Sequence, residues 1–227
     1  MQTVAFPEKT PPVKPGRREA RREERREAIL DVAVQAFLEH GYGGTTMSAI
    51  AGALGGSKGT LWSYFPSKEL LFAAVLDRAT AEFREQLLLT LAEGEPVEIA
   101  LEKFCTMFIG KLTSPPAIAL YRLVISGTRR FPEVGRIYYE RAPQPMLELM
   151  SGYIGCVMKR GNLRDADPFE AAQTLVALCT ARSHQRLLTG VCAGLTEAEV
   201  TGEAAKAVDL FMRAYGSGEL AVAPAGS

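Results

Sequence analysis

The chain has 227 residues, 47% of them hydrophobic and 23% charged, and its 26 lysines and arginines balance its 26 aspartates and glutamates. This is the composition of an ordinary globular protein, and the zero net charge excludes a uniformly basic nucleic-acid-binding chain. The apolar stretches break at charges or prolines short of the ~20 residues of a membrane span, and the N-terminus lacks the apolar core of a secretory signal.

The N-terminal segment combines prolines with a run of basic residues. Prolines 7, 11, 12 and 15 predict a disordered tail over residues 1–18. Between Lys14 and Arg26 there are seven basic and three acidic residues. A basic arm of this kind is typical of proteins that bind nucleic acid. It is equally typical of a solvated helix face with ion pairs three or four residues apart.

Four helices are predicted in the first 91 residues. Apolar side chains recur at helical spacing from about 20 to 40, and Gly41 ends this first helix. A short helix is expected over 45–54, where Thr45 or Thr46 can cap the first turn. A second short helix is expected over 57–64 with Ser57 as its cap. Pro66 ends it, and a long helix then runs over 67–91.

The two short helices fit a helix-turn-helix. Ile50 and its apolar neighbours give the first of them a small packing face, and Gly55 supplies the unusual dihedral angles of a tight turn. Short polar residues begin the second helix, where side chains reach base edges and phosphates of DNA: Ser57, Lys58, Gly59 and Thr60. The spacing alone also fits a purely structural helical hairpin.

The rest of the chain is predicted to be helical, because apolar residues keep the helical spacing throughout and no segment alternates as a strand does. Asp167 followed by Pro168 is a strong helix start. A Gly-, Ala- and Pro-rich tail is expected over 217–227. The predicted helices cover about 96–112, 116–129, 133–141, 145–160, 167–189 and 196–215.

Two stretches resemble a known family. The run from Thr45 to Ala51, continued from Gly55 to Leu71, is similar to the DNA-binding signature of TetR-family transcriptional regulators, and the match extends over about 25–75. Gly56 departs from the small apolar residue usual in the family, and Trp62 departs from the usual Tyr or Phe. Residues 95–215, with Arg130-Phe131-Pro132, resemble the C-terminal domain of AefR-like members.

This resemblance implies an all-α homodimer with an N-terminal three-helix helix-turn-helix domain and a C-terminal helical bundle for ligand binding and dimerisation. We expect the DNA-binding domain over 19–66 and the bundle over 67–216. The resemblance also implies that Lys68, at the start of the fourth helix, contacts DNA phosphates. The expected DNA-binding residues are Arg25, Arg26, Thr45, Thr46, Ser57, Lys58, Gly59, Thr60, Trp62, Tyr64 and Lys68.

The C-terminal half offers candidates for an effector pocket and for a dimer interface. Pockets for small molecules are largely apolar with a few polar anchors. The candidate pocket residues are Phe104, Phe108, Tyr121, Arg122, Phe131, Tyr138, Met150 and His184. Apolar stripes on the last two long helices could pair with their copies or pack inside one subunit. The candidate interface residues are Leu175, Cys179, Val200, Ala204, Val208 and Phe211.

The function expected from these features is regulation of transcription by a repressor that a small apolar effector releases from a palindromic operator. The alternatives are an activator or ligand-independent regulator with the same fold, or a helical enzyme or small-molecule carrier. The four cysteines form no CxxC pair and are typical of buried thiols in a reducing cytoplasm. We expect a cytoplasmic protein without a metal, a cofactor, a catalytic site or a membrane contact.

Overall fold

The computed structural model describes residues 16–55, 58–91 and 95–217, and within them the chain forms eleven helices and no strand. The predicted all-α class is confirmed. The termini expected to be disordered fall largely outside the described residues. The helices are α1 (Arg17–Gly44), α2 (Met47–Ala53), α3 (Lys58–Tyr64), α4 (Lys68–Thr90), α5 (Val97–Thr113), α6 (Pro115–Thr128), α7 (Pro132–Arg141), α8 (Pro143–Lys159), α9 (Pro168–Thr180), α10 (Ser183–Leu188) and α11 (Glu197–Tyr215).

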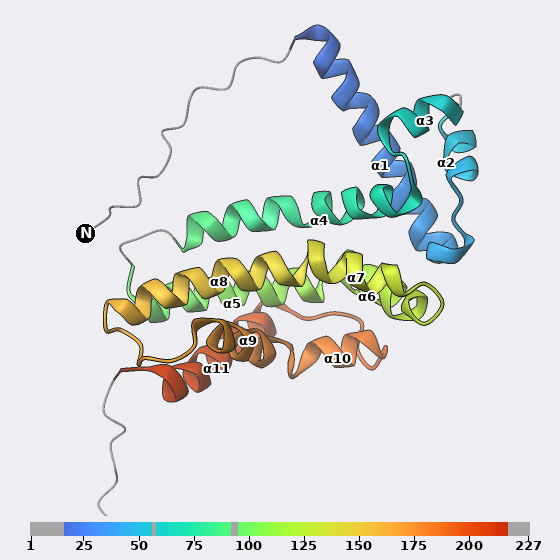
Figure 1. Ribbon diagram of the computed structural model, residues 1–227. Helices are drawn as coiled ribbons and strands as arrows, with labels where there is room; N and C mark the ends of the chain where they lie inside the picture. The colour runs from blue at the N-terminus through green and yellow to red at the C-terminus, as the bar shows by residue number, and fades with distance from the viewer. Residues whose placement is uncertain (1–15, 56–57, 92–94, 218–227) are drawn as a thin grey trace, which may run out of the picture.

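The first three helices form a separate lobe at one end of the molecule (Figure 1). Gly41 adopts a φ of +69°, a left-handed value that favours glycine, and this kinks α1 where the sequence predicted its end. Gly55, with a φ of +62°, plays the same part after α2, as predicted for the turn. Helix α2 therefore packs against both α1 and α3.

An aromatic cluster forms the centre of this lobe. Phe37 and Tyr42 from α1 meet Phe72 from α4, with ring centroids between 5.2 and 5.8 Å apart. All three side chains are buried, and Ile50 and Leu61 bring α2 and α3 into the same core. The apolar face predicted for the first short helix is thus explained by its packing on α1 and α4.

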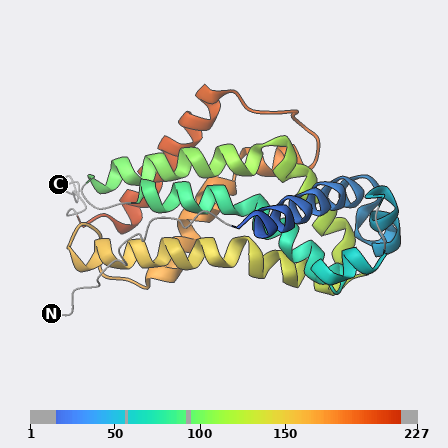
Figure 2. The ribbon, with the colours of Figure 1, turned by 90° about the horizontal axis from the view of Figure 1, so that it is seen from above.

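The C-terminal helices form a bundle with its own core. In Figure 1, α4 lies above α5 and α8, while α9, α10 and α11 lie below them; Figure 2 shows α4, α5 and α8 running along the same axis. Helices α5, α8, α9 and α11 contribute most of the second core, which includes the buried cysteines Cys105 and Cys179.

Helices α6 and α7 join the two lobes. Leu123 and Val124 from α6, with Val134 and Ile137 from α7, are buried in the same core as residues of α1, α2 and α3, not in the core of the bundle. Phe131, between these helices, packs edge-on against Tyr42 at 5.5 Å. The first core is therefore completed by residues about 80 positions further along the chain.

One predicted helix is wrong in its extent. The sequence indicated a continuous helix over 167–189, but the structure divides it into α9 and α10 at Arg182, whose φ and ψ are −109° and −87°. The next residue, Ser183, is buried and its hydroxyl donates a hydrogen bond to the Glu203 carboxylate on α11. This contact with a distant helix cannot be read from local spacing.

Candidate DNA interface and ligand cleft

The second short helix, α3, presents polar residues to solvent. Lys58 and Gly59 in its first turn are exposed, and the Trp62 indole one turn later is 38% exposed. Thr60 is partly buried, and Leu61 anchors the helix in the core. Ser57, the expected cap of this helix, lies outside the described residues. The helix is therefore held by one face while its other face can meet a groove of DNA.

The two neighbouring threonines before α2 have different roles. Thr46 is exposed and caps α2, since its hydroxyl oxygen accepts a hydrogen bond from the Ala49 amide at 3.1 Å. Thr45 is 1% exposed, and its hydroxyl lies 2.9 Å from the Ala36 carbonyl and 2.8 Å from the Gly41 carbonyl. The expected DNA contact by the Thr45 side chain is therefore corrected: this hydroxyl ties the interhelical loop to the kinked end of α1.

The basic run is part of α1 rather than a separate arm. Because residues three and four apart share a helix face, Arg18, Arg21, Arg22 and Arg25 lie together along about two turns, on the same side as buried Ile29. We call these four residues the arginine face. The guanidinium of Arg22 lies 5.9 Å from the centre of the Tyr64 ring on α3. The arginine face thus meets α3 at the C-terminal end of that short helix.

Arg26 is more engaged within the protein than its neighbours. Its Nη1 atom lies 3.4 Å from the Glu23 carboxylate and 3.1 Å from that of Glu27, and its guanidinium lies 5.8 Å from the Phe65 ring centre. Both Arg25 and Arg26 are partly buried. The sequence interpretation favoured phosphate contact for Arg21, Arg22, Arg25 and Arg26, and its final list of DNA-binding residues kept only Arg25 and Arg26.

Lys68, expected to contact phosphate, makes contacts inside the lobe. Its Nζ atom donates hydrogen bonds to the carbonyl oxygens of Tyr42 at 2.9 Å and Thr45 at 3.2 Å, and it lies 4.1 Å from the centre of the Tyr42 ring. An ammonium group has three donors, so one remains for another partner. Lys68 therefore first closes the loop between α1 and α2, and a phosphate contact would add to that role.

The Tyr42 hydroxyl completes this junction. It donates a hydrogen bond to Glu69 Oε1 at 3.3 Å. Burial, followed by the negative charges of Glu69 and Glu133, raises the pKa of Tyr42 well above its ordinary value, so the phenol stays protonated as a donor. Hydrogen bonds from its own amide and from the Ser67 hydroxyl lower the pKa of Glu69, which keeps the acceptor ionised.

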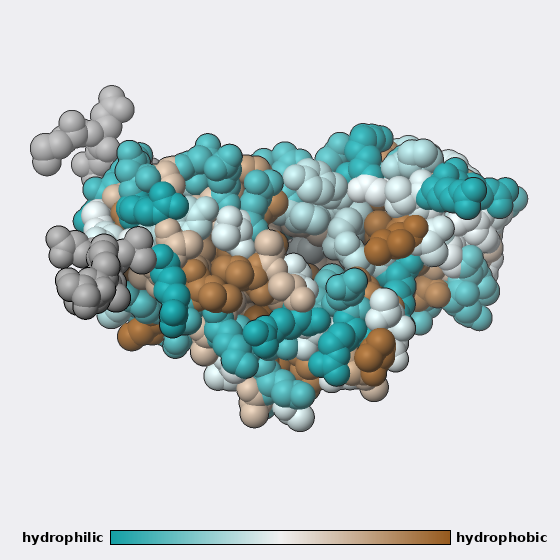
Figure 3. All heavy atoms as spheres, turned by 90° about the horizontal axis from the view of Figure 1, so that it is seen from below, coloured by the Kyte–Doolittle hydropathy of each residue, from teal (hydrophilic) through white to brown (hydrophobic). Residues whose placement is uncertain are grey.

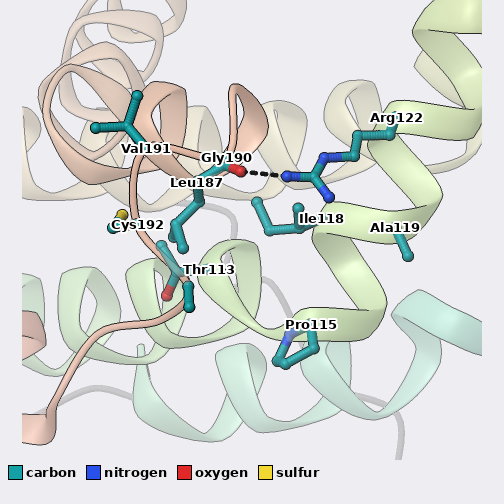
Figure 4. Close-up of a pocket in the computed structure, with 10 residues that line it drawn as sticks. Thr113, Pro115, Ile118, Ala119, Arg122, Leu187, Gly190, Val191 and Cys192 are labelled. Atoms are coloured by element: carbon teal, nitrogen blue, oxygen red, sulfur yellow. Dashed lines mark hydrogen bonds between the residues drawn. The ribbon is translucent and has the colours of Figure 1, made fainter.

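A cleft of about 530 Å³ opens in the C-terminal bundle between the start of α6 and the end of α10 (Figure 4). Polar and apolar surface contribute almost equally to its walls. Arg122 reaches across from α6, where Nε donates to the Leu188 carbonyl at 3.0 Å and Nη2 to the Leu187 carbonyl at 2.6 Å. The lining residues are Thr113, Pro115, Ile118, Ala119, Arg122, Leu187, Gly190, Val191, Cys192 and Ala193.

Of the predicted pocket residues, Arg122 lines this cleft and the other seven do not. Phe104, Phe108 and Met150 are buried in the core of the bundle, where Phe104 and Phe108 stack at 5.3 Å. Phe131 belongs to the other core, against Tyr42. The structure thus places these four residues in the two cores rather than along the cleft. Core and pocket positions of a helical bundle draw on the same apolar residue types.

The remaining three predicted pocket residues form a small aromatic cluster. The Tyr121 ring lies 5.6 Å from the Tyr138 ring and 5.3 Å from the His184 ring, both in edge-on geometry. Burial raises the pKa of Tyr138 to about 12 and lowers the pKa of His184. His184 is therefore kept neutral as part of the contact between α6 and α10.

Two family models match the chain, and together they cover both lobes. The model of the bacterial regulatory proteins of the tetR family matches residues 29–75, which include α2, α3 and the start of α4. The model of the AefR-like transcriptional repressor C-terminal domain matches residues 99–217, more than half of the chain. The chain belongs to the TetR family. It is accordingly a DNA-binding transcriptional regulator, which points to a function other than catalysis.

Individual TetR-family relatives agree with this assignment. The transcriptional regulator RutR of Escherichia coli K12 is 32% identical over 168 residues, which span 67% of this chain and 71% of RutR. The transcriptional repressor ComR of the same strain is 34% identical over 112 residues, which span only 49% of this chain and 53% of ComR.

Solved structures of TetR-family proteins share the whole fold. A regulator from Mesorhizobium loti MAFF303099 superimposes with a TM-score of 0.74 at 27% identity, covering 86% of this chain and 98% of that structure. The flavonoid-responsive regulator FrrA gives a TM-score of 0.72 at 28% identity, with the same coverage. The helix-turn-helix lobe and the bundle are therefore arranged as in other members.

The TetR-family dimer residues expected from the sequence are mostly core residues of one subunit. Leu175, Cys179, Ala204, Val208 and Phe211 are each at most 4% exposed. Only Val200 is partly exposed. The prediction of these five as contacts with a partner is corrected: the stripe on α11 packs against α5 and α9 of its own chain. An apolar stripe alone does not show which of two partners covers it.

In the part of the chain that the structure describes, no cluster of three or more His, Cys, Asp or Glu side chains could hold a metal ion. Among its helices, none is sufficiently long and apolar to cross a membrane.

Proposed function

We propose that this protein is a cytoplasmic homodimeric repressor that binds a palindromic operator and leaves it when a small molecule occupies the bundle. The observation that carries the proposal is the exposed face of α3 next to the arginine face of α1. A helix with short polar side chains can enter the major groove, while arginines beside it neutralise phosphates.

The roles of the DNA-binding residues differ by position. Lys58 and Thr60, with Gly59 between them, are proposed to contact base edges, because the first turn of a recognition helix reaches deepest into the groove. Thr46, Trp62 and Tyr64 are proposed to meet the sugar-phosphate backbone at its sides. The arginine face would then follow the backbone beyond the groove, a sequence-independent contact that depends strongly on salt.

The dimer is proposed to form through the outer face of α9 and α11. Phe169 on α9 and Leu210 on α11 are 36% and 49% exposed. Leu210 lies two turns from Glu203, which accepts a hydrogen bond from Ser183 at the start of α10. In Figure 3, apolar residues gather on the underside of the molecule, the side where Figure 1 places α9 and α11. A two-fold dimer would separate the recognition helices by about 34–36 Å, one turn of DNA.

The cleft beside Arg122 is proposed as the effector site. Its volume of about 530 Å³ falls in the range of small-molecule pockets, and Arg122 is the single cation among the described residues that line it. FrrA, of similar fold, is named for its response to flavonoids. A ligand that binds one arrangement of the bundle better than another would shift the population away from the spacing that fits DNA.

The test of DNA recognition begins with selection of duplexes from a random pool by the purified protein. Fluorescence anisotropy then compares the wild type with Lys58→Ala and with Lys159→Ala, an exposed lysine at the end of α8. We expect Lys58→Ala to weaken binding to the selected DNA by about 1–3 kcal/mol and Lys159→Ala to leave it unchanged. Failure of the wild type to enrich any sequence would refute the proposed function.

The test of the dimer compares two exposed leucines. Leu210→Glu places a charge on the proposed interface, whereas Leu89→Glu places one on α4, where Leu89 is 76% exposed. Since both leucines are solvated in a single subunit, neither change should unfold it. Sedimentation equilibrium should give a dimer for the wild type and for Leu89→Glu, and a monomer for Leu210→Glu. If Leu210→Glu remains dimeric, the proposed location of the interface on α9 and α11 is contradicted.

A further inference from the structure

Arg122 is the single charge in the wall of the cleft. The other nine described lining residues carry no charge. They include the Thr113 hydroxyl and the Cys192 thiol, and the rest are apolar residues or glycine. The hydroxyl, on Thr113, already donates to the Ile109 carbonyl at 2.7 Å. A ligand that enters this cleft therefore meets one strong polar anchor, and that anchor is a cation.

The present partners of this cation are weak acceptors for a guanidinium. Arg122 donates to the neutral carbonyls of Leu187 and Leu188 at the C-terminal end of α10, and Figure 4 shows the bond to Leu187. Gly190 follows with a φ of +77°, and a Cβ atom there would lie 4.0 Å from Arg122 Nη2. An ionised carboxylate offers charge-assisted, bidentate hydrogen bonds, which are stronger than those to neutral carbonyls.

We propose that the cleft binds a small organic carboxylate with an apolar body, and that the carboxylate takes Arg122 away from the end of α10. This inference rests on the proposed effector function and specifies the chemistry of the ligand. The acid group would pair with Arg122, while the apolar body packs between Ile118 on α6 and Leu187 and Val191 at the end of α10.

The position of Arg122 in the chain couples this exchange to the DNA-binding lobe. The next two residues, Leu123 and Val124, are 7% and 4% exposed and lie in the core shared with α1. One turn later α6 passes close to the end of α1, where a Cβ on Gly127 would lie 3.9 Å from Tyr42 Cβ. Release of α10 by Arg122 would therefore allow α6 to move against helices that position α2 and α3.

The binding test uses octanoate and octanamide, which have the same length and nearly the same shape but differ in charge at neutral pH. Isothermal titration calorimetry with the full chain should show octanoate binding about tenfold or more tightly than octanamide. Arg122→Gln should bind both probes equally weakly, and Arg122→Lys should recover only part of the preference because it cannot form the bidentate pair. Arg129→Gln, an exposed arginine at the end of α6, is the matched control and should behave as wild type.

The coupling test uses the only tryptophan of the chain, Trp62 in α3, as a reporter remote from the cleft. Octanoate should change the Trp62 emission and weaken binding to the selected DNA by about fivefold or more, and octanamide should do neither. In Arg122→Gln both effects of octanoate should disappear. Because this variant lacks the hydrogen bonds from Arg122 to the end of α10, its DNA affinity without a probe should already be lower than that of the wild type.

The outcomes separate this inference from the proposed function. Wild type that binds selected DNA but shows no preference for octanoate over octanamide overturns the carboxylate inference and leaves the DNA-binding function intact. Binding of octanoate without any change in Trp62 emission or DNA affinity overturns the coupling. The comparison of octanoate with octanamide on the wild type uses no variant. It can therefore contradict the inference even if Arg122→Gln fails to fold.

Discussion

The residues predicted to be functional differ in exposure between the DNA-binding lobe and the C-terminal bundle. In the lobe, most of the polar residues singled out on α3 are exposed, and the apolar residues between them form the core. In the bundle, most of the candidates for pocket and interface are themselves the core. The difference arises because a polar residue in an amphipathic helix has a defined side, whereas an apolar residue in a bundle fits core, pocket and interface alike.

The largest change in stability is expected at Phe211 on α11, whose neighbour Leu210 serves as the control. Phe211 is fully buried and stacks on Tyr215 at 4.9 Å, while Leu210 is 49% exposed. We expect Phe211→Ala to lower the free energy of unfolding by about 3–5 kcal/mol. Leu210→Ala should cost less than about 1 kcal/mol within the subunit. Urea denaturation followed by circular dichroism, at concentrations where both are monomeric, measures this; equal losses would contradict the assignment of Phe211 to the core.

A buried hydroxyl in the lobe should behave like a core residue of the bundle. Thr45→Val keeps the shape of the side chain but leaves the carbonyls of Ala36 and Gly41 without that donor. The expected loss of stability is about 1–2 kcal/mol. DNA affinity at saturating folded protein should be unchanged. Thermal denaturation and anisotropy on the selected DNA together decide this, and a loss of affinity without a loss of stability would return Thr45 to the DNA interface.

Two lysines of the lobe sharpen the same contrast. Lys68→Met removes an ammonium that donates to two carbonyls, so stability should fall by about 1–2 kcal/mol. Lys58→Met removes an exposed side chain and should leave stability within about 0.5 kcal/mol while weakening DNA binding. The slope of log K against log salt adds a further measure: a fall of about 1 for Lys68→Met would show that its third donor reaches a phosphate.

The smallest expected effect concerns pH and His184. Burial holds the pKa of His184 in the folded protein below the ordinary value of about 6.5, so on acidification the unfolded chain takes up this proton first. Stability contributed by the neutral imidazole is therefore complete above pH 7 and falls as the pH decreases through 6.5 towards the folded pKa. His184→Gln should flatten this part of the stability profile.

The control for the pH experiment is His40→Gln, since His40 is exposed at the end of α1. We expect its profile between pH 7 and pH 5 to follow that of the wild type. Chemical denaturation at a series of pH values provides the measurement. A profile that is unchanged by His184→Gln would show that the contact with Tyr121 does not depend on the neutral imidazole.

Local sequence signals were sufficient for the all-α class, the family and the two short helices of the helix-turn-helix. These features depend on the spacing of apolar residues, a threonine cap that the sequence left open between Thr45 and Thr46, the φ-positive Gly55 and a motif confined to about 50 residues. Each of these signals lies in neighbouring residues of the chain, so it can be recognised without knowledge of distant contacts.

Tertiary structure alone decided what the remaining candidates do. Lys68 donates a hydrogen bond to the Thr45 carbonyl and so closes the loop between α1 and α2. Phe131 packs against Tyr42, about 90 residues earlier in the chain. Ser183 lies where a predicted helix is interrupted, and it donates a hydrogen bond to Glu203. The outward face of α11 was likewise fixed by packing on α5 and α9. These outcomes depend on which helices meet and at which side chains, and a pattern of apolar residues constrains that choice only weakly because several faces of a bundle helix can be buried.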